Sequence, residues 1–340
     1  MTRINPITLA AAAIGAATAT TLGAAALTLA AVAAAVAITR ALRSKPLAPG
    51  SVIVITGGSR GLGLAIANRF AQTAVKLVLC SRHLAELQLA QTNLLAKHPH
   101  LHPEDFYLVA ADLSKPEDAQ RLISETIVRF GRIDVLVNNA AVIEVGPIES
   151  QTLEIFERTM QINFFAALYT IWAALPHMRT QAPPTNSTLA VRAGRRASIV
   201  NIASIGGKIA VPHMLPYSAS KFALVGFSEG LHAELRHKGI RVTTVCPGLM
   251  RTGGEDHAKF VGNIEAERRW FMFAATTPGV AVTADYAANR IFHAVAAGRA
   301  EITISPQAFL AARFGGLCPE TLQYANALTN QHILPKAPTV

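Results

Sequence analysis

The stretch ITGGSRGLG occupies residues 55–63 and directly follows the apolar run SVIV. A short β-branched run is typical of a buried strand, and glycines after it are typical of a tight turn into a helix. Gly57, Gly61 and Gly63 carry no Cβ, so backbone N–H groups and a helix amino terminus can approach a pyrophosphate closely. The stretch therefore predicts a strand, a phosphate-binding loop and a helix.

Short apolar runs continue along the chain and alternate with amphipathic segments, as in a parallel sheet that is covered by helices on both faces. The seven expected strands are residues 51–56, 76–81, 105–112, 133–140, 197–204, 240–247 and 301–305. We expect an α/β fold with a doubly wound parallel sheet, the Rossmann fold, over residues 46–310 and a carboxyl-terminal tail over 311–340. Ligands of such sheets bind at the carboxyl ends of the strands.

Residues 1–45 have a different composition from the rest of the chain. No charged residue lies between Arg3 and Arg40, and residues 21–38 are apolar and long enough to cross a hydrocarbon core of about 30 Å. A signal peptide has a shorter apolar region, and a soluble helix has a polar face. We therefore expect a hydrophobic helix within residues 7–39 that anchors the chain in a membrane. Because basic residues follow this segment, the globular domain is expected on the cytoplasmic side.

The charge of the chain excludes one class of partner. The formal net charge is +10, of which four charges lie before residue 46, so the remainder is mildly basic. Basic residues do not form runs interleaved with aromatic residues, and we therefore expect no nucleic-acid partner. The three cysteines are widely spaced without a CxxC pattern, and no metal site is expected.

The end of the second expected strand indicates which dinucleotide the loop would hold. An NAD site places Asp or Glu there to bind the ribose hydroxyls, whereas this chain has Ser81 and Arg82, and Arg60 lies within the glycine loop. The two guanidinium groups can bind a 2′-phosphate, and neither Ser81 nor Arg82 supplies a carboxylate that would repel it. The sequence therefore predicts NADP(H) as the cofactor.

A second group of residues carries acid and base chemistry. Tyr217 and Lys221 are four residues apart in YSASK, so on a helix they share one face. A neighbouring cation favours the charged form of a phenol, which would bring its pKa closer to the range for proton exchange with an alcohol or carbonyl. Ser204, after the fifth expected strand, can hydrogen-bond the same substrate oxygen.

These motifs, in this order, resemble the short-chain dehydrogenases/reductases, in their single-domain branch. The resemblance covers residues 51–252, with a looser match to about residue 305. It rests on TGGSRGLG for the glycine loop, ADL (111–113), NNAA (138–141), QINFF (161–165), IAS (202–204), YSASK (217–221) and PGLMRT (247–252). The departures are Ala141 in place of the usual glycine, an insertion over 179–196 that we expect to be a surface loop, and the amino-terminal apolar segment.

The resemblance implies an NADP(H)-dependent oxidoreductase that transfers hydride between nicotinamide and a carbonyl or alcohol. Its catalytic tetrad would be Asn163, Ser204, Tyr217 and Lys221: Tyr217 transfers the proton, Ser204 polarises the substrate oxygen, Lys221 binds the nicotinamide ribose, and Asn163 holds a relay water. The same carry-over implies that the cofactor is bound by Thr56, Gly57, Ser59, Arg60, Gly61, Leu62, Gly63, Ser81, Arg82, Asp112, Leu113, Asn139, Ala140, Tyr217, Lys221, Pro247, Gly248 and Thr252.

The substrate is less closely determined by the sequence. Residues 253–280 would form the substrate lid, and WFMF at 270–273 either lines an apolar pocket or forms the buried face of a lid helix. A membrane anchor favours a lipophilic small molecule. A 3-oxoacyl-carrier-protein-type reductase, a non-catalytic NADP(H)-binding protein, and assembly as a homo-oligomer are alternatives that the sequence leaves open.

Overall fold

The structure is a computed structural model that describes residues 47–183, 195–253, 257–276 and 281–336. Pro46–Val340 forms one compact unit, separate from Met1–Lys45. The membrane anchor expected within residues 7–39 and most of the loop expected over 179–196 lie outside the described residues. Within the described ranges, no helix is both long and apolar enough to cross a membrane.

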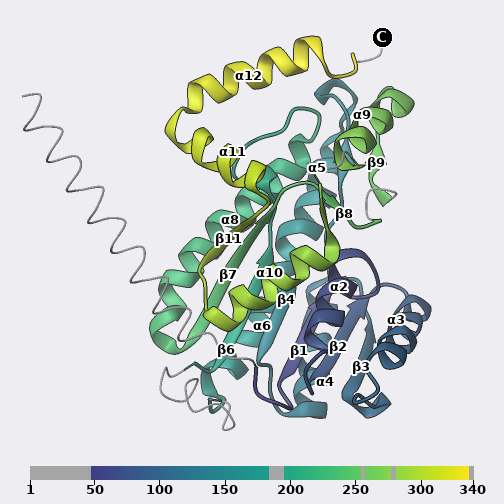
Figure 1. The fold of residues 1–340 in the computed structure, drawn as a ribbon, viewed down its shortest axis with the longest axis vertical. Helices are drawn as coiled ribbons and strands as arrows, with labels where there is room; N and C mark the ends of the chain where they lie inside the picture. Colours follow the sequence, from purple (N-terminus) through teal and green to yellow (C-terminus); the bar gives the residue numbers. More distant parts are fainter. Residues whose placement is uncertain (1–46, 184–194, 254–256, 277–280, 337–340) are drawn as a thin grey trace, which may run out of the picture. The chain divides into compact units, whose positions relative to one another are not determined.

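A seven-stranded sheet forms the centre of the unit, in the order β11-β7-β6-β4-β1-β2-β3, and every neighbouring pair is parallel (Figure 1). The strands are β1 (Val52–Thr56), β2 (Lys76–Ser81), β3 (Phe106–Ala110), β4 (Val135–Asn138), β6 (Ala197–Ile202), β7 (Ile240–Pro247) and β11 (Glu301–Ile304). All seven expected strands are present, and the prediction of a doubly wound Rossmann-type α/β fold is confirmed.

Two layers of helices cover the sheet. One face packs against α2 (Gly61–Phe70), α3 (Leu84–Lys97) and α10 (Ala284–Ala297). The other packs against α4 (Pro116–Phe130), α6 (Ala166–Thr180) and α8 (Leu215–Leu235). Shorter helices are η1 (Pro103–Asp105), η2 (Ile148–Ser150), α5 (Leu153–Met160), η3 (Gln161–Phe165), η4 (Ile205–Gly207) and η5 (Arg236–Lys238).

Strand β1 shows why these runs are continuously apolar. All five of its residues are buried: Ile53 and Ile55 face the core under α2 and α10, and Val52 and Val54 face the core under α4 and α6. Burying one such side chain contributes about 1.5–3 kcal/mol relative to leaving it in water. A polar residue at any of these four positions would therefore destabilise one of the two cores.

The strand order reverses between β1 and β4, which places the carboxyl ends of these two strands beside each other. Two short parallel pairs lie outside the main sheet: β5 (Glu144–Val145) with β9 (Lys259–Phe260), and β8 (Met250–Arg251) with β10 (Val282–Thr283). The carboxyl-terminal part contains α9 (Ile264–Thr276), α11 (Pro306–Leu317) and α12 (Pro319–His332). The expected tail is thus largely helical.

Candidate active site

The glycine loop between β1 and α2 fits the close approach of a phosphate. Gly57 and Gly61 have positive φ angles of 63° and 56°. A Cβ on Gly63 would lie 2.0 Å from the carbonyl oxygen of Gly57, so only glycine fits there. Arg60, the residue before α2, does not cap the helix with its side chain. The first-turn amide groups, including that of Leu62, are therefore available to an anion.

Residues from the end of β4 hold this loop in place. Thr56 Oγ1 accepts hydrogen bonds from the backbone N–H groups of Asn139 at 2.9 Å and Ala140 at 3.0 Å. Asn139 Nδ2 in turn donates to the carbonyl oxygens of Thr56 at 3.0 Å and Gly57 at 3.2 Å. The NNAA segment thus fixes the glycine loop to the neighbouring strand, and a Cβ on Gly57 would meet Asn139 Nδ2 at 2.9 Å.

At the other end of the loop, the structure adds a carboxylate that the sequence interpretation missed. Ser59 Oγ donates to Glu86 Oε2 at 2.9 Å, and Arg60 Nη1 lies 3.4 Å from Glu86 Oε1. Glu86 is in the first turn of α3, shortly after Ser81. The sequence interpretation considered only Ser81 and Arg82 at the end of the strand and therefore missed this carboxylate. An acidic residue in the first turn of the helix after β2 was the available signal.

Ser81 and Arg82 lie at the end of β2 and just beyond it. The Ser81 hydroxyl donates to the carbonyl oxygen of His83 at 3.2 Å and accepts from the His83 N–H at 3.3 Å. Arg82 is exposed, and its side chain forms no hydrogen bond or ion pair with the described residues. Of the two arginines that the sequence singles out, Arg60 therefore contacts a carboxylate, and Arg82 extends into solvent.

The remaining cofactor residues of the sequence prediction lie at the same edge of the sheet. Asp112 Oδ1 accepts from the Ser114 N–H at 3.2 Å and hydroxyl at 2.8 Å, and Leu113 is buried. Pro247 ends β7, and the Gly248 N–H donates to the Ile304 carbonyl oxygen at 2.9 Å. The carbonyl oxygen of Thr252 would lie 3.5 Å from a Cβ on Gly61, so PGLMRT runs beside the glycine loop.

Ser204, Tyr217 and Lys221 come together beside the end of β6. Tyr217 and Ser204 both lie next to Gly206: a Cβ there would be 3.3 Å from Tyr217 Cε1 and 3.5 Å from Ser204 Oγ. The Ser204 Oγ accepts a hydrogen bond from the Gly206 N–H at 3.0 Å. Lys221 lies one turn after Tyr217 on α8, and its Nζ is 5.6 Å from the centroid of the Tyr217 ring. The same Nζ donates to the Ile202 carbonyl oxygen at 2.8 Å. Strand β6 and helix α8 thus position all three side chains.

Burial controls the electrostatics of this group. It lowers the pKa of Lys221, which is 2% exposed, to about 8. It raises the pKa of Tyr217 above the ordinary value, while the hydrogen bond with Ser204 acts in the opposite direction. The sequence interpretation expected the neighbouring lysine to lower the tyrosine pKa, whereas burial raises that pKa in the structure. A phenol with a raised pKa stays protonated at neutral pH and can donate a proton.

Asn163 lies in η3, a five-residue π-helix between α5 and α6. Its Oδ1 accepts from the Val142 N–H at 2.8 Å, and its Nδ2 donates to the Val142 carbonyl oxygen and to Ser220 Oγ, both at 3.0 Å. Ser220 Oγ donates to the Tyr217 carbonyl oxygen at 2.7 Å. Both amide protons of Asn163 are therefore used, and its side chain braces the helix that carries Tyr217 rather than contacting Lys221.

A buried polar network ties the lid to the loop before Tyr217, and the sequence interpretation missed its significance. His213 has a positive φ of 64°, and its Nδ1 lies 2.8 Å from Oε1 of Glu267 on α9. Trp270 Nε1 donates to the other carboxylate oxygen at 2.6 Å. Both His213 and Glu267 are buried. This network holds α9 against the segment that leads into α8.

The same helix supplies an apolar wall beside the tyrosine. Val145, Met214 and Phe271 form a buried cluster, against which Tyr217 packs. Trp270 and Met272 also pack against the cluster, and so do Ile143, Val211, Ala258 and Phe260. Phe273 is 73% exposed. The WFMF segment therefore contributes three side chains to an apolar surface at Tyr217, whereas its last residue faces away.

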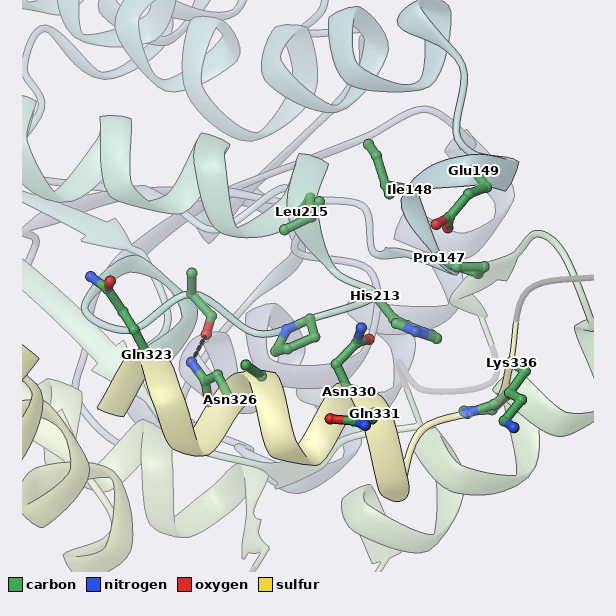
Figure 2. Close-up of a pocket in the computed structure, with 14 residues that line it drawn as sticks. Pro147, Ile148, Glu149, His213, Leu215, Gln323, Asn326, Asn330, Gln331 and Lys336 are labelled. Atoms are coloured by element: carbon green, nitrogen blue, oxygen red, sulfur yellow. Dashed lines mark hydrogen bonds between the residues drawn. The ribbon is translucent and has the colours of Figure 1, made fainter. Parts of the chain in front are cut away.

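A cavity of about 520 Å³ lies beside the loop that leads into α8 (Figure 2). Residues of one face of α12 line one side, among them Asn326, Ala327 and Asn330. Figure 2 shows the opposite side, which includes Pro147 and His213. Asn326 Nδ2 donates to the Ala210 carbonyl oxygen at 2.9 Å, which connects the two sides. The carboxyl-terminal helix thus lines one side of an open space next to the loop that precedes Tyr217, and Tyr217 itself does not line this space.

Comparison with known proteins agrees with this geometry. The model of the family described as short chain dehydrogenase matches residues 51–259. The mouse protein "Dehydrogenase/reductase SDR family member 7B" is 33% identical over 211 residues, which are 62% of this chain and 61% of that protein. "11-beta-hydroxysteroid dehydrogenase A" of Sesamum indicum is 31% identical over 280 residues, which are 81% of this chain and 74% of that protein.

Solved structures show the same fold. A short-chain dehydrogenase of Streptomyces avermitilis has a TM-score of 0.66 at 26% identity, covering 83% of this chain and 96% of that one. A Burkholderia phymatum protein, described as a complex with NAD, has a TM-score of 0.69 at 24% identity, covering 86% of this chain and 99% of that one. This chain therefore belongs to the short-chain dehydrogenase family, whose members are oxidoreductases that bind a nicotinamide cofactor.

Proposed function

We propose that this protein is an NADP(H)-dependent carbonyl reductase or alcohol dehydrogenase with a lipophilic substrate. The observation that carries the proposal is the placement of Ser204 and Tyr217 next to Gly206, with Lys221 Nζ 5.6 Å from the centroid of the Tyr217 ring. The glycine loop would bind the pyrophosphate, Arg60 and Arg82 the 2′-phosphate, Asp112 the adenine, and Thr252 the carboxamide. The bound nicotinamide would supply the hydride.

The protein's own residues would then handle the proton and orient the substrate. In the direction of reduction, the Tyr217 hydroxyl donates its proton to the substrate oxygen, and the Ser204 hydroxyl hydrogen-bonds that oxygen and polarises the carbonyl. Lys221 would bind the nicotinamide ribose, and Asn163 would hold α8 in position through Ser220.

Two features support a lipophilic substrate. Tyr217 packs with Trp270 and Met272 against an apolar cluster that includes Phe271, and a cavity under α12 lies beside the loop that precedes Tyr217. The name of the sesame relative refers to a hydroxysteroid, a lipophilic alcohol, as its substrate. An anchor within residues 7–39 would keep the catalytic domain at the cytoplasmic face of a membrane, where such molecules accumulate.

The test is a panel of ketones and alcohols, from small aldehydes and sugars to steroid-sized compounds, with NADPH or NADH for reduction and NADP⁺ or NAD⁺ for oxidation. We expect turnover of apolar ketones with NADPH. Turnover restricted to sugars or to acyl-carrier-protein thioesters would contradict the proposed substrate class. Binding of NADPH without turnover of any carbonyl or alcohol would contradict the enzymatic role.

A further inference from the structure

The carboxylate of Glu86 occupies the end of the glycine loop where a 2′-phosphate would bind. Its Oε2 accepts from Ser59 Oγ at 2.9 Å, and its Oε1 lies 3.4 Å from Arg60 Nη1. The side chains of Arg60 and Glu86 are 49% and 37% exposed, so a cofactor can reach both. The carboxylate thus contacts the two donors that the glycine loop offers at this end.

The Ser59 hydroxyl can donate a hydrogen bond to the Glu86 carboxylate or to a phosphate, but not to both at once. A serine hydroxyl has a single proton, so Ser59 donates it either to Glu86 or to a phosphate oxygen. Arg60 has further N–H groups, but its charge is partly offset by the carboxylate beside it. In addition, a carboxylate and a phosphate at this distance repel each other.

The neighbouring groups do not remove this competition. Ser81 bonds to the backbone of His83, and Arg82 makes no hydrogen bond or ion pair with any residue in the described ranges. Arg82 is thus a cation without a carboxylate partner there, whereas Arg60 has one. A 2′-phosphate held by Arg82 would still lie near the negative charge of Glu86.

We propose that Glu86 competes with the 2′-phosphate of NADP(H) for Ser59 and Arg60 and thereby limits the selectivity of this protein for NADP(H) over NAD(H). The inference rests on the proposed NADP(H) site and assigns to it a residue that opposes binding. The adenosine and its unphosphorylated ribose carry no added charge here, so Glu86 affects the binding of NAD(H) little.

The test uses two fragments that differ only in the group concerned, 2′,5′-ADP and 5′-AMP, with calorimetric dissociation constants for the purified protein. Glu86→Gln keeps the size of the side chain and its acceptor oxygen but removes the charge. We expect the dissociation constant of 2′,5′-ADP to fall about fivefold, as for the removal of one exposed charge pair, and that of 5′-AMP to stay unchanged. The difference in 2′,5′-ADP affinity between Glu86→Gln and the wild type should be smaller at high salt concentration.

Glu117→Gln is the matched control, because Glu117 is an exposed acidic residue in the first turn of the next helix, α4. It should change neither constant. An unchanged or larger dissociation constant for 2′,5′-ADP in Glu86→Gln would overturn the inference, and so would an equal gain for 5′-AMP. If the wild type binds both fragments equally, the proposed NADP(H) preference is wrong. The role of Glu86 is tested separately, by the change in the dissociation constant of 2′,5′-ADP between the wild type and Glu86→Gln.

Discussion

The ammonium nitrogen of Lys221 lies 5.6 Å from the centroid of the Tyr217 ring and donates a hydrogen bond to the carbonyl oxygen of Ile202. Burial acts on the two side chains in opposite senses, lowering the pKa of Lys221 and raising that of Tyr217. The neutral form is favoured in each case. A buried ammonium is therefore costly here, and that cost can be measured as a dependence of stability on pH.

The free energy of unfolding of the cofactor-free wild type should rise with pH relative to that of Lys221→Met. The pKa of Lys221 is about 8 in the folded protein and about 10.4 when unfolded, so between these values the unfolded chain binds the extra proton. Wild type should gain on the order of 2 kcal/mol over the variant between pH 7 and pH 10. Urea unfolding at both pH values measures this. A difference that is constant with pH would contradict the lowered pKa, and Lys97→Met, at an exposed lysine, controls for general effects.

Cofactor preference should depend on Arg82. Arg82→Ala would remove the proposed charge-assisted contact to the 2′-phosphate, and Ser81→Asp with Arg82→Ala would add a carboxylate suited to ribose hydroxyls. We expect NADPH to bind at least tenfold more weakly in Arg82→Ala, and the double variant to prefer NADH. Dissociation constants for both nucleotides check this. A wild type that already prefers NADH would refute the roles of Arg60 and Arg82.

Filling the cavity under α12 should affect large substrates selectively. Ala327 lines the cavity, whereas Ala325 is an exposed residue of the same helix outside its lining. Ala327→Trp should raise KM for a steroid-sized ketone several-fold, leave KM for a small ketone unchanged, and leave NADPH binding unchanged. Ala325→Trp should change none of these. Equal effects of both variants would show that the cavity does not hold substrate.

The anchor expected within residues 7–39 makes a prediction about fractionation. The full-length chain should stay with membranes through a carbonate wash, and its catalytic domain should resist protease added outside intact cells. Removal of residues 1–45 should release a soluble protein that binds cofactor, since the sheet and the candidate site lie within Pro46–Val340. Full-length protein in the soluble fraction without detergent would argue against the anchor but leave the catalytic proposal intact.

The fold could be predicted because buried parallel strands must be apolar on both faces, as β1 is. The glycine loop could be predicted because Gly57 and Gly61 adopt positive φ angles, which favour glycine. Tyr217 and Lys221 could be paired because helical spacing fixes which side chains share a face. For Glu86 the only signal was its place in the first turn of the helix after β2. Glu267 and His213 could not be paired, since their contact joins segments that are 54 residues apart. Spacing carries no information on such pairs.

The account depends most on Tyr217 as the proton donor. Tyr217→Phe keeps the ring that packs against the apolar cluster and deletes the hydroxyl, so it removes the proposed proton donor and leaves the packing of the ring unchanged. The decisive measurement is kcat for the best ketone of the panel, together with the dissociation constant of NADPH, for the wild type and this variant. We predict that kcat falls by more than about a hundredfold while NADPH affinity changes less than about twofold. Retention of more than about a tenth of wild-type kcat would contradict the assignment of Tyr217 as the acid.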